Sequence, residues 1–91
     1  MDLPKLWKLI EADLERARRT LPEDASNHQA MLKYQEYLDH NELELACDML
    51  EVCAEDHQVR KEFWLALRDA AVKMNLPSKS DYEEKANRTE E

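Results

Sequence analysis

Apolar side chains recur along the first segment of the chain at steps of three and four residues, the spacing of one helix face. This segment runs from about Leu3 to Arg19, and Pro4 suits its first turn, where the missing N–H would lack a partner anyway. The pattern predicts an amphipathic helix with one stripe facing a core: Leu3, Leu6, Trp7, Ile10, Leu14 and Ala17.

Three further segments carry apolar residues at helical spacing. The second ends near Asp39, the third runs from about Glu42 to Asp56, and the fourth runs from about Gln58 to Asn75. Apolar residues cover more than half the circumference of the third helix, so we expect it to be the most enclosed. The residues of the fourth segment that should face inward are Val59, Phe63, Trp64, Leu67, Ala70, Ala71 and Met74.

The ends of these segments carry residues that start and stop helices. Ser26 followed by Gln29 has the form of a capping box, which predicts the start of the second helix. Asn41 and Asn75 stand where the second and fourth helices should end, and asparagine tolerates the left-handed backbone that ends a helix. The chain has no glycine to take that role.

These segments predict an all-α fold with a single core. The absence of glycine argues against a strand-rich domain, because tight turns use it, and 91 residues suit one domain. Short connections favour antiparallel neighbours, so we expect a compact antiparallel bundle of four helices over residues 1–77. Residues 78–91 have Tyr82 as their one large apolar side chain, and we expect a polar tail that is mobile or adds one short turn.

The net charge of −8 comes entirely from the middle of the chain. Residues 34–59 hold eight acids and no lysine or arginine, whereas the rest of the chain holds thirteen acids and thirteen bases. Like charges three or four residues apart destabilise a helix by about 0.2–0.5 kcal/mol per pair. Four of the acids nevertheless follow one another at such steps on the outer side of the third helix, and we call them the acidic line: Glu44, Asp48, Glu51 and Glu55.

Two explanations of the acidic line stay open at this point. In the first, the line is a solvated face, or cations of the same chain neutralise it; the candidates are Arg16, Arg18, Arg19 and Lys33. In the second, the line docks a basic protein, whose association it accelerates by electrostatic steering. An acidic surface repels phosphates, so we do not expect direct binding to DNA or RNA.

No pattern of catalytic or metal-binding residues stands out. His28, His40 and His57 have no close ligand spacing with one another or with Cys47 and Cys53. A carboxylate acid–base pair needs a pocket that separates the two pKa values, and a phosphate-binding loop needs glycine. We therefore predict no enzyme, no cofactor and no metal, and we interpret the cysteines as reduced thiols of a cytoplasmic protein without a membrane span.

Two stretches, EYLDHNELELACDMLEVCAED and FWLALRDAAVKMNL, combine a tyrosine–leucine pair, a turn, acids around a Leu-Ala pair, and a last helix ending in Met and Leu. The positions that carry this combination are Tyr37, Leu38, Glu42, Leu45, Ala46, Asp48, Met49, Leu50, Glu51, Ala70, Ala71, Met74 and Leu76. In them the chain from Gln35 to Leu76 resembles the MafI-like family of small bacterial immunity proteins. That family usually has glycine in the turn, where this chain has Asn41.

The resemblance implies a cytoplasmic all-α protein of polymorphic toxin systems that binds and neutralises one cognate toxin, often a nuclease or another cationic enzyme. We accordingly predict a partner-binding surface, with a tyrosine as its anchor, at these residues: Tyr37, Asp39, Glu42, Glu44, Asp48, Glu51 and Glu55. The alternative is a small adaptor or regulatory protein that acts through an apolar groove or a homodimer face. The sequence does not indicate the oligomeric state.

Overall fold

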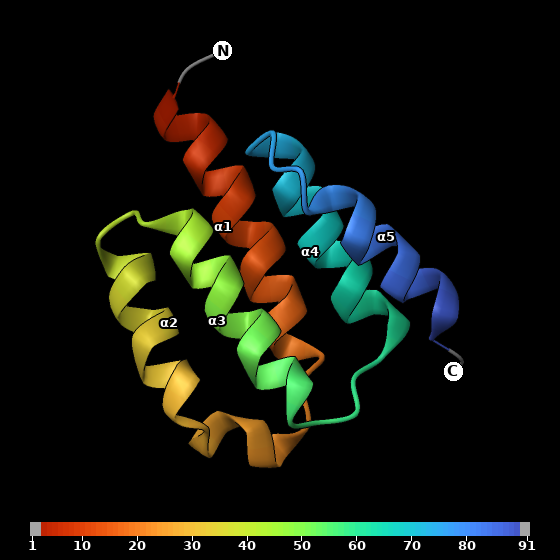
Figure 1. Ribbon diagram of the computed structural model, residues 1–91. Helices are drawn as coiled ribbons and strands as arrows, with labels where there is room; N and C mark the ends of the chain where they lie inside the picture. Colours follow the sequence, from red (N-terminus) through yellow and green to blue (C-terminus); the bar gives the residue numbers. More distant parts are fainter. Residues whose placement is uncertain (1–2, 90–91) are drawn as a thin grey trace.

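A computed structural model describes residues 3–89 of the chain, apart from the side chains of residues 26 and 27. Within this range the chain is helical and contains no strand, which confirms the predicted all-α class. Figure 1 shows the elements, which are α1 (Leu3–Arg19), the 3-10 helix η1 (Glu23–Asn27), α2 (Gln29–Asp39), α3 (Leu43–Glu55), α4 (Lys61–Lys73) and α5 (Lys79–Arg88).

The helices do not pack as the expected four-helix bundle of sequence neighbours. α1 lies at the centre, with α4 on one side and α3 on the other, while α2 covers α3 and α5 covers α4 (Figure 1). α3 and α4 follow each other in sequence but lie on opposite sides of α1, because the connection through residues 56–60 crosses the end of the molecule. α1 and α3 run in the same direction and pack side by side, whereas an antiparallel bundle places helices of opposite direction next to each other, so the predicted antiparallel four-helix bundle is not confirmed.

The core lies between these helices and combines large side chains with alanines. Tyr34, Leu50, Phe63 and Leu67 are fully buried, and the alanines of α3 and α4 let the neighbouring backbones approach closely. Buried apolar area of this kind is the main source of stability for a small helical domain. None of the helices within residues 3–89 has both the length and the apolar character that crossing a bilayer requires.

The segment expected to be a polar tail, residues 78–91, forms the helix α5 over most of its described part. Tyr82 and Ala86 are buried, one helical turn apart, and the ring of Tyr82 stacks on Trp64 of α4 with 6.1 Å between centroids. The Lys85 Nζ lies 4.7 Å from the centroid of the same indole ring. The apolar pattern did not predict the packing of α5 on α4, because two buried positions give almost no periodic signal. Residues 90–91 of the expected tail lie outside the described range.

Both asparagines that were expected to end helices have the predicted left-handed backbone. Asn41 has a φ of 57° after α2, and Asn75 has a φ of 56° after α4. In each case the following residue donates its N–H back to a carbonyl of the helix: Glu42 to Tyr37 at 2.8 Å, and Leu76 to Ala71 at 2.9 Å. Asparagine therefore does here what glycine does in most helix ends.

The start of α2 differs from the expected capping box. Ser26 belongs to η1, its side chain lies outside the described part, and α2 begins at Gln29. The N-cap is His28, whose Nδ1 accepts the Ala30 N–H at 3.0 Å while its Nε2 lies 2.7 Å from Asp56 Oδ2 at the end of α3. The imidazole thus caps one helix and ties it to the next, which no local sequence pattern indicates.

Candidate functional site

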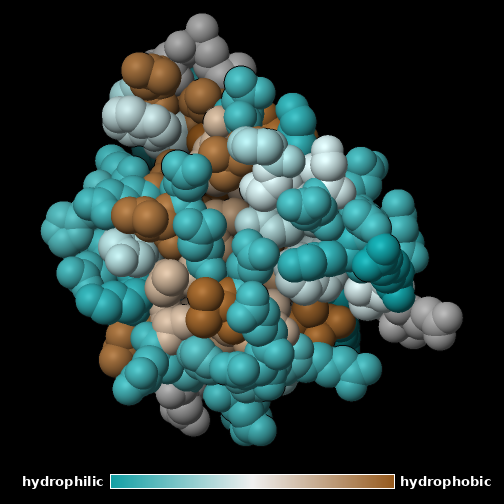
Figure 2. Space-filling view, viewed as in Figure 1, coloured by the Kyte–Doolittle hydropathy of each residue, from teal (hydrophilic) through white to brown (hydrophobic). Residues whose placement is uncertain are grey.

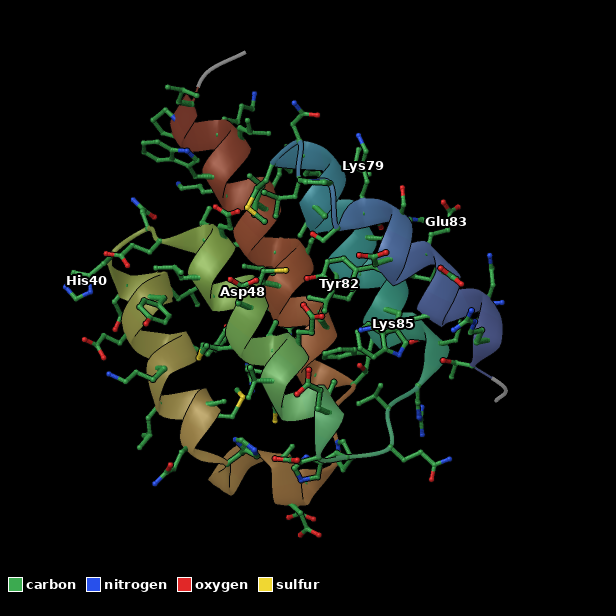
Figure 3. The ribbon with its side chains drawn as sticks, viewed as in Figure 1. His40, Asp48, Lys79, Tyr82, Glu83 and Lys85 are labelled. Atoms are coloured by element: carbon green, nitrogen blue, oxygen red, sulfur yellow. The ribbon has the colours of Figure 1, made fainter. Side chains whose placement is uncertain are left out.

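The helix α3 has a buried apolar face and an acidic outer face. Leu43, Cys47 and Leu50 are buried, whereas Asp48 lies on the outside of the helix (Figure 3). Leu43 begins the helix with Glu42 before it, and Glu44 lies in the first turn, where the positive end of the helix dipole favours acids. The amphipathic period of the sequence therefore places the acidic line on the outer side of α3, as predicted.

One member of the acidic line is paired within the chain. Glu51 is half-buried on the side of α3 that faces α5; the Tyr82 hydroxyl donates to its Oε2 at 2.9 Å and the Lys85 Nζ lies 3.4 Å from its Oε1. Figure 3 shows Tyr82 and Lys85 pointing from α5 toward α3. Glu51 thus holds α5 in place, and its charge is largely satisfied within the monomer.

Arg16 and Arg18 of α1 bind acids elsewhere, and Arg19 forms no ion pair with the acidic line either. Arg16 Nη2 lies 2.6 Å from Asp69 Oδ2, and Arg18 Nε lies 2.7 Å from Glu15 Oε2. Within residues 3–89 no lysine or arginine forms an ion pair with any of four exposed acids, which we call the free acids: Glu42, Glu44, Asp48 and Glu55. The described part of the chain therefore exposes a negative surface on α3 that none of its own lysines or arginines neutralises.

Asp48 lies between Glu44 and Glu51 on this surface, and its surroundings disfavour the ionised carboxylate. Partial burial raises the pKa of Asp48, and the negative charges of Glu51 and Glu44 raise that pKa further. A raised pKa means that the fold disfavours the ionised carboxylate relative to the unfolded chain. A cation supplied from outside would relieve this cost, which makes Asp48 a good contact for a basic group.

Of the two tyrosines of α2, one is buried and the other is partly exposed. Tyr34 is fully buried and its hydroxyl donates to Glu15 at 3.3 Å, while Tyr37 is half-buried and packs against the core. Asp39, at the end of α2, is exposed and accepts a hydrogen bond from the Gln35 amide at 3.0 Å. Tyr37 and Asp39 lie in the last turn of α2, which the turn at Asn41 connects to the start of α3, and the anchor role of Tyr37 stays a prediction.

An open groove of about 520 Å³ lies beside the start of the acidic line. It forms where the first turns of α1, the α2–α3 turn and the end of α4 meet. In Figure 2 brown apolar side chains interrupt the polar surface near the N-terminal end of α1. The residues that line the groove are Leu6, Trp7, Ile10, Asn41, Glu42, Leu43, Glu44, Leu45, Lys73 and Met74.

Trp7 and Leu45 correct two expectations about the core. Trp7 is 39% exposed and Leu45 is 42% exposed, although the first was expected in the core and the third helix was expected to be the most enclosed. The start of α1 projects beyond the α2–α3 turn (Figure 1), which agrees with the partial exposure of the Trp7 side chain. Leu45 does carry a sequence signal, because it is an apolar residue on the charged side of α3, next to Glu44.

The charge around the groove is negative. Lys73 is the one cation among the described residues that line it, and its Nζ lies 2.6 Å from Oδ2 of the buried Asp13. This pair neutralises the lysine, whereas Glu42 and Glu44 on the rim are free acids. The groove therefore combines an apolar floor with an acidic edge.

Within the described part of the chain, no three His, Cys, Asp or Glu side chains are placed to hold a metal ion. Burial raises the pKa of the Cys47 thiol to about 12, and the hydroxyl of Tyr82 lies 3.5 Å from its sulfur. This cysteine is protonated at neutral pH and shielded from solvent, which suits packing rather than nucleophilic chemistry.

Two features thus stand out: free acids along the length of α3, and a partly exposed tryptophan in a groove beside the first two of them, Glu42 and Glu44. Comparison with known proteins gives no match to this chain among family models, curated proteins or solved structures. The resemblance to the MafI-like immunity proteins therefore stays a prediction carried by residues 35–76.

Proposed function

We propose that this chain is a non-catalytic inhibitor of the immunity type, which binds a basic protein toxin and blocks it by occupying its active site or a surface beside it. The observation that carries the proposal is the set of free acids along α3, none of which forms an ion pair with a lysine or arginine among residues 3–89. The predicted relationship to the MafI-like family agrees with this function but does not carry it.

The mechanism needs charge complementarity and no chemistry. A cationic enzyme such as a nuclease has a cleft that attracts phosphates, and carboxylates spaced along a rigid helix can take the place of those phosphates. The field of the free acids extends over roughly 8 Å at physiological salt, which guides a basic partner before contact. Glu51 contributes indirectly, because its bonds to Tyr82 and Lys85 keep α5 docked beside α3.

Neutralisation of toxicity is the direct test. The product of the gene adjacent to this one is expressed in a heterologous host with and without this chain, and the two proteins are then purified together. We expect the chain to restore growth and to form a stoichiometric complex whose affinity falls as ionic strength rises. Growth that is not restored, or a neighbouring product without toxicity, would contradict the proposal.

A matched pair of variants tests the surface itself. The first removes three of the free acids: Glu44→Gln, Asp48→Asn and Glu55→Gln. The control removes the same number of charges away from α3: Glu11→Gln, Glu62→Gln and Glu83→Gln. Close pairs of charges at exposed positions each contribute up to about 1 kcal/mol, so we expect the first variant to bind roughly tenfold or more weakly than the control at low salt.

The groove favours a second candidate function, an adaptor or regulatory protein that docks an apolar segment. The two functions differ in their response to salt, because steering by charge is screened while apolar docking is almost insensitive to ionic strength. An affinity that does not change between low and high salt, for a partner that is not toxic, would favour the adaptor.

A further inference from the structure

The groove brings together a tryptophan and carboxylates, and at another place in the chain the same two kinds of side chain are joined by a lysine. Near the start of α4, away from the groove at the end of that helix, Lys85 lies over the ring of Trp64, 4.7 Å from its centroid, and its ammonium reaches Glu51 at 3.4 Å. In this trio of tryptophan, cation and carboxylate, the ammonium makes a cation–π contact with the ring and an ion pair with the acid. It covers Trp64, which is 9% exposed.

At the groove the same trio lacks its cation. Trp7 presents part of its ring, and Glu42 and Glu44 lie on the rim of the same cavity. Lys73 does not fill the role, because its ammonium is bound to Asp13 at 2.6 Å. A lysine or arginine from outside could lay its aliphatic stem on the indole and bring its charge to the free acids.

The apolar floor of the groove suits a second kind of side chain from a partner, a large apolar one. Leu6, Ile10 and Met74 line it together with the half-exposed Leu45. An opening of about 520 Å³ with such walls accommodates a large apolar side chain, whose burial would release water from both surfaces. Exposed apolar patches rimmed by charge are typical of protein interaction sites.

A second copy of this chain is a poor occupant. Two copies would each bring a net charge of −8. Pairing their grooves would also place Glu42 and Glu44 of one copy near the same acids of the other. Like charges held close across an interface oppose association, so the charge pattern favours a basic partner over self-association.

We propose that the groove is the anchor site for a segment of the partner protein that presents a large apolar side chain next to lysine or arginine. This inference rests on the proposed function and deepens it: the free acids of α3 guide the basic partner, and the groove holds it. Trp7 is then the residue that determines affinity, since binding energy concentrates in buried aromatic anchors rather than in exposed charges, and Leu45 contributes the apolar wall beside it.

The test is a titration of the full ¹⁵N-labelled chain with three synthetic peptides of equal length, followed by NMR. The first peptide has lysine and leucine at helical spacing, the second replaces each leucine by serine, and the third replaces each lysine by glutamate. We expect the first to shift the indole N–H signal of Trp7 and the amide signals of Leu45 and Lys73, while the indole of Trp64 stays unchanged. The second should bind about tenfold more weakly and leave Trp7 unmoved, and the third should not bind.

Matched variants assign the effect to the groove. Leu45→Gln should weaken the lysine–leucine peptide about tenfold, whereas Leu32→Gln, at a 77% exposed position on α2, should leave its affinity within about twofold. Both sites are open to solvent, so both variants are expected to fold. Glu44→Gln should weaken the same peptide more than Glu62→Gln, a charge at the start of α4.

The possible failures separate the two proposals. If the lysine–serine peptide binds as tightly as the lysine–leucine peptide, or Leu45→Gln has no effect, the groove is not the anchor, while the proposed function stands. If the glutamate–leucine peptide binds as well as the lysine–leucine peptide, the site is apolar without charge selection, and both proposals fail. No shift with any peptide, or a concentration-dependent dimer that buries Trp7, overturns the inference.

Discussion

Replacing Asp48 by asparagine should make the protein more stable at neutral pH, although the residue lies on the surface proposed to bind a partner. Its carboxylate has acids one turn away in both directions, Glu44 and Glu51, and no cation within ion-pair distance among residues 3–89. Asparagine has nearly the same shape and carries no charge. The substitution therefore removes the repulsion and leaves the packing unchanged.

The size of the gain follows from the number of repulsive pairs. Asp48 forms one like-charge pair at a spacing of four residues and one at a spacing of three. Each such pair destabilises a helix by roughly 0.2–0.5 kcal/mol, so their removal should raise the free energy of unfolding by about 0.4–1 kcal/mol. Glu51 is itself partly neutralised by Lys85 at 3.4 Å, which places the expected gain toward the lower end.

Urea unfolding followed by circular dichroism measures this gain, and its dependence on pH and salt identifies the cause. Because the folded pKa of Asp48 is raised, the penalty is absent below the unfolded pKa of about 3.9 and fully present above the folded pKa. The stabilising effect of Asp48→Asn should therefore be seen at pH 7 and vanish near pH 3. It should also shrink in high salt, because salt screens exposed charges.

Asp69 is the matched control, because its environment is the reverse. Burial alone would raise the pKa of Asp69, but hydrogen bonds from Arg16 and Arg68 outweigh it and lower that pKa. The stability that its charge provides is present above pH 4 or so and is lost as pH falls through the lowered folded pKa. Asp69→Asn should destabilise the protein by about 1–2 kcal/mol at pH 7. If Asp48→Asn also destabilises, Asp48 has a favourable partner and the idea of an unneutralised surface is wrong.

Three further predictions concern the core and the helix ends. Tyr82→Phe removes the hydrogen bond to Glu51 at 2.9 Å and should lower the free energy of unfolding by about 1.5–3 kcal/mol in urea titrations; an unchanged midpoint would show that α5 does not depend on it. Cys47 has a pKa raised by burial to about 12, so iodoacetamide at pH 8 should label it only after unfolding, and rapid labelling of the native chain seen by mass spectrometry would contradict its burial. Asn75→Gly should stabilise by roughly 0.5–1 kcal/mol, because the φ of 56° costs glycine less, and a loss of melting temperature would disprove this.

The sequence alone determined the local features of this protein. The period of its apolar residues predicted the four helices α1–α4, including the bounds of the first from Leu3 to Arg19. The asparagines at 41 and 75 predicted the left-handed ends of α2 and α4, and the run of acids predicted a charged outer face on α3. These features depend on residues a few positions apart, and such short-range interactions can be evaluated from the order of the residues.

The tertiary structure decided which of these surfaces remain available. Only the packing order, with α1 between α3 and α4, leaves Trp7 half-covered at the projecting start of α1. Only the docking of α5 brings Tyr82 to Glu51, which is 31 positions away in sequence, and removes that acid from the free surface. Contacts of this kind depend on where helices end and cross in space, and neither periodicity nor charge counting along one helix contains that information.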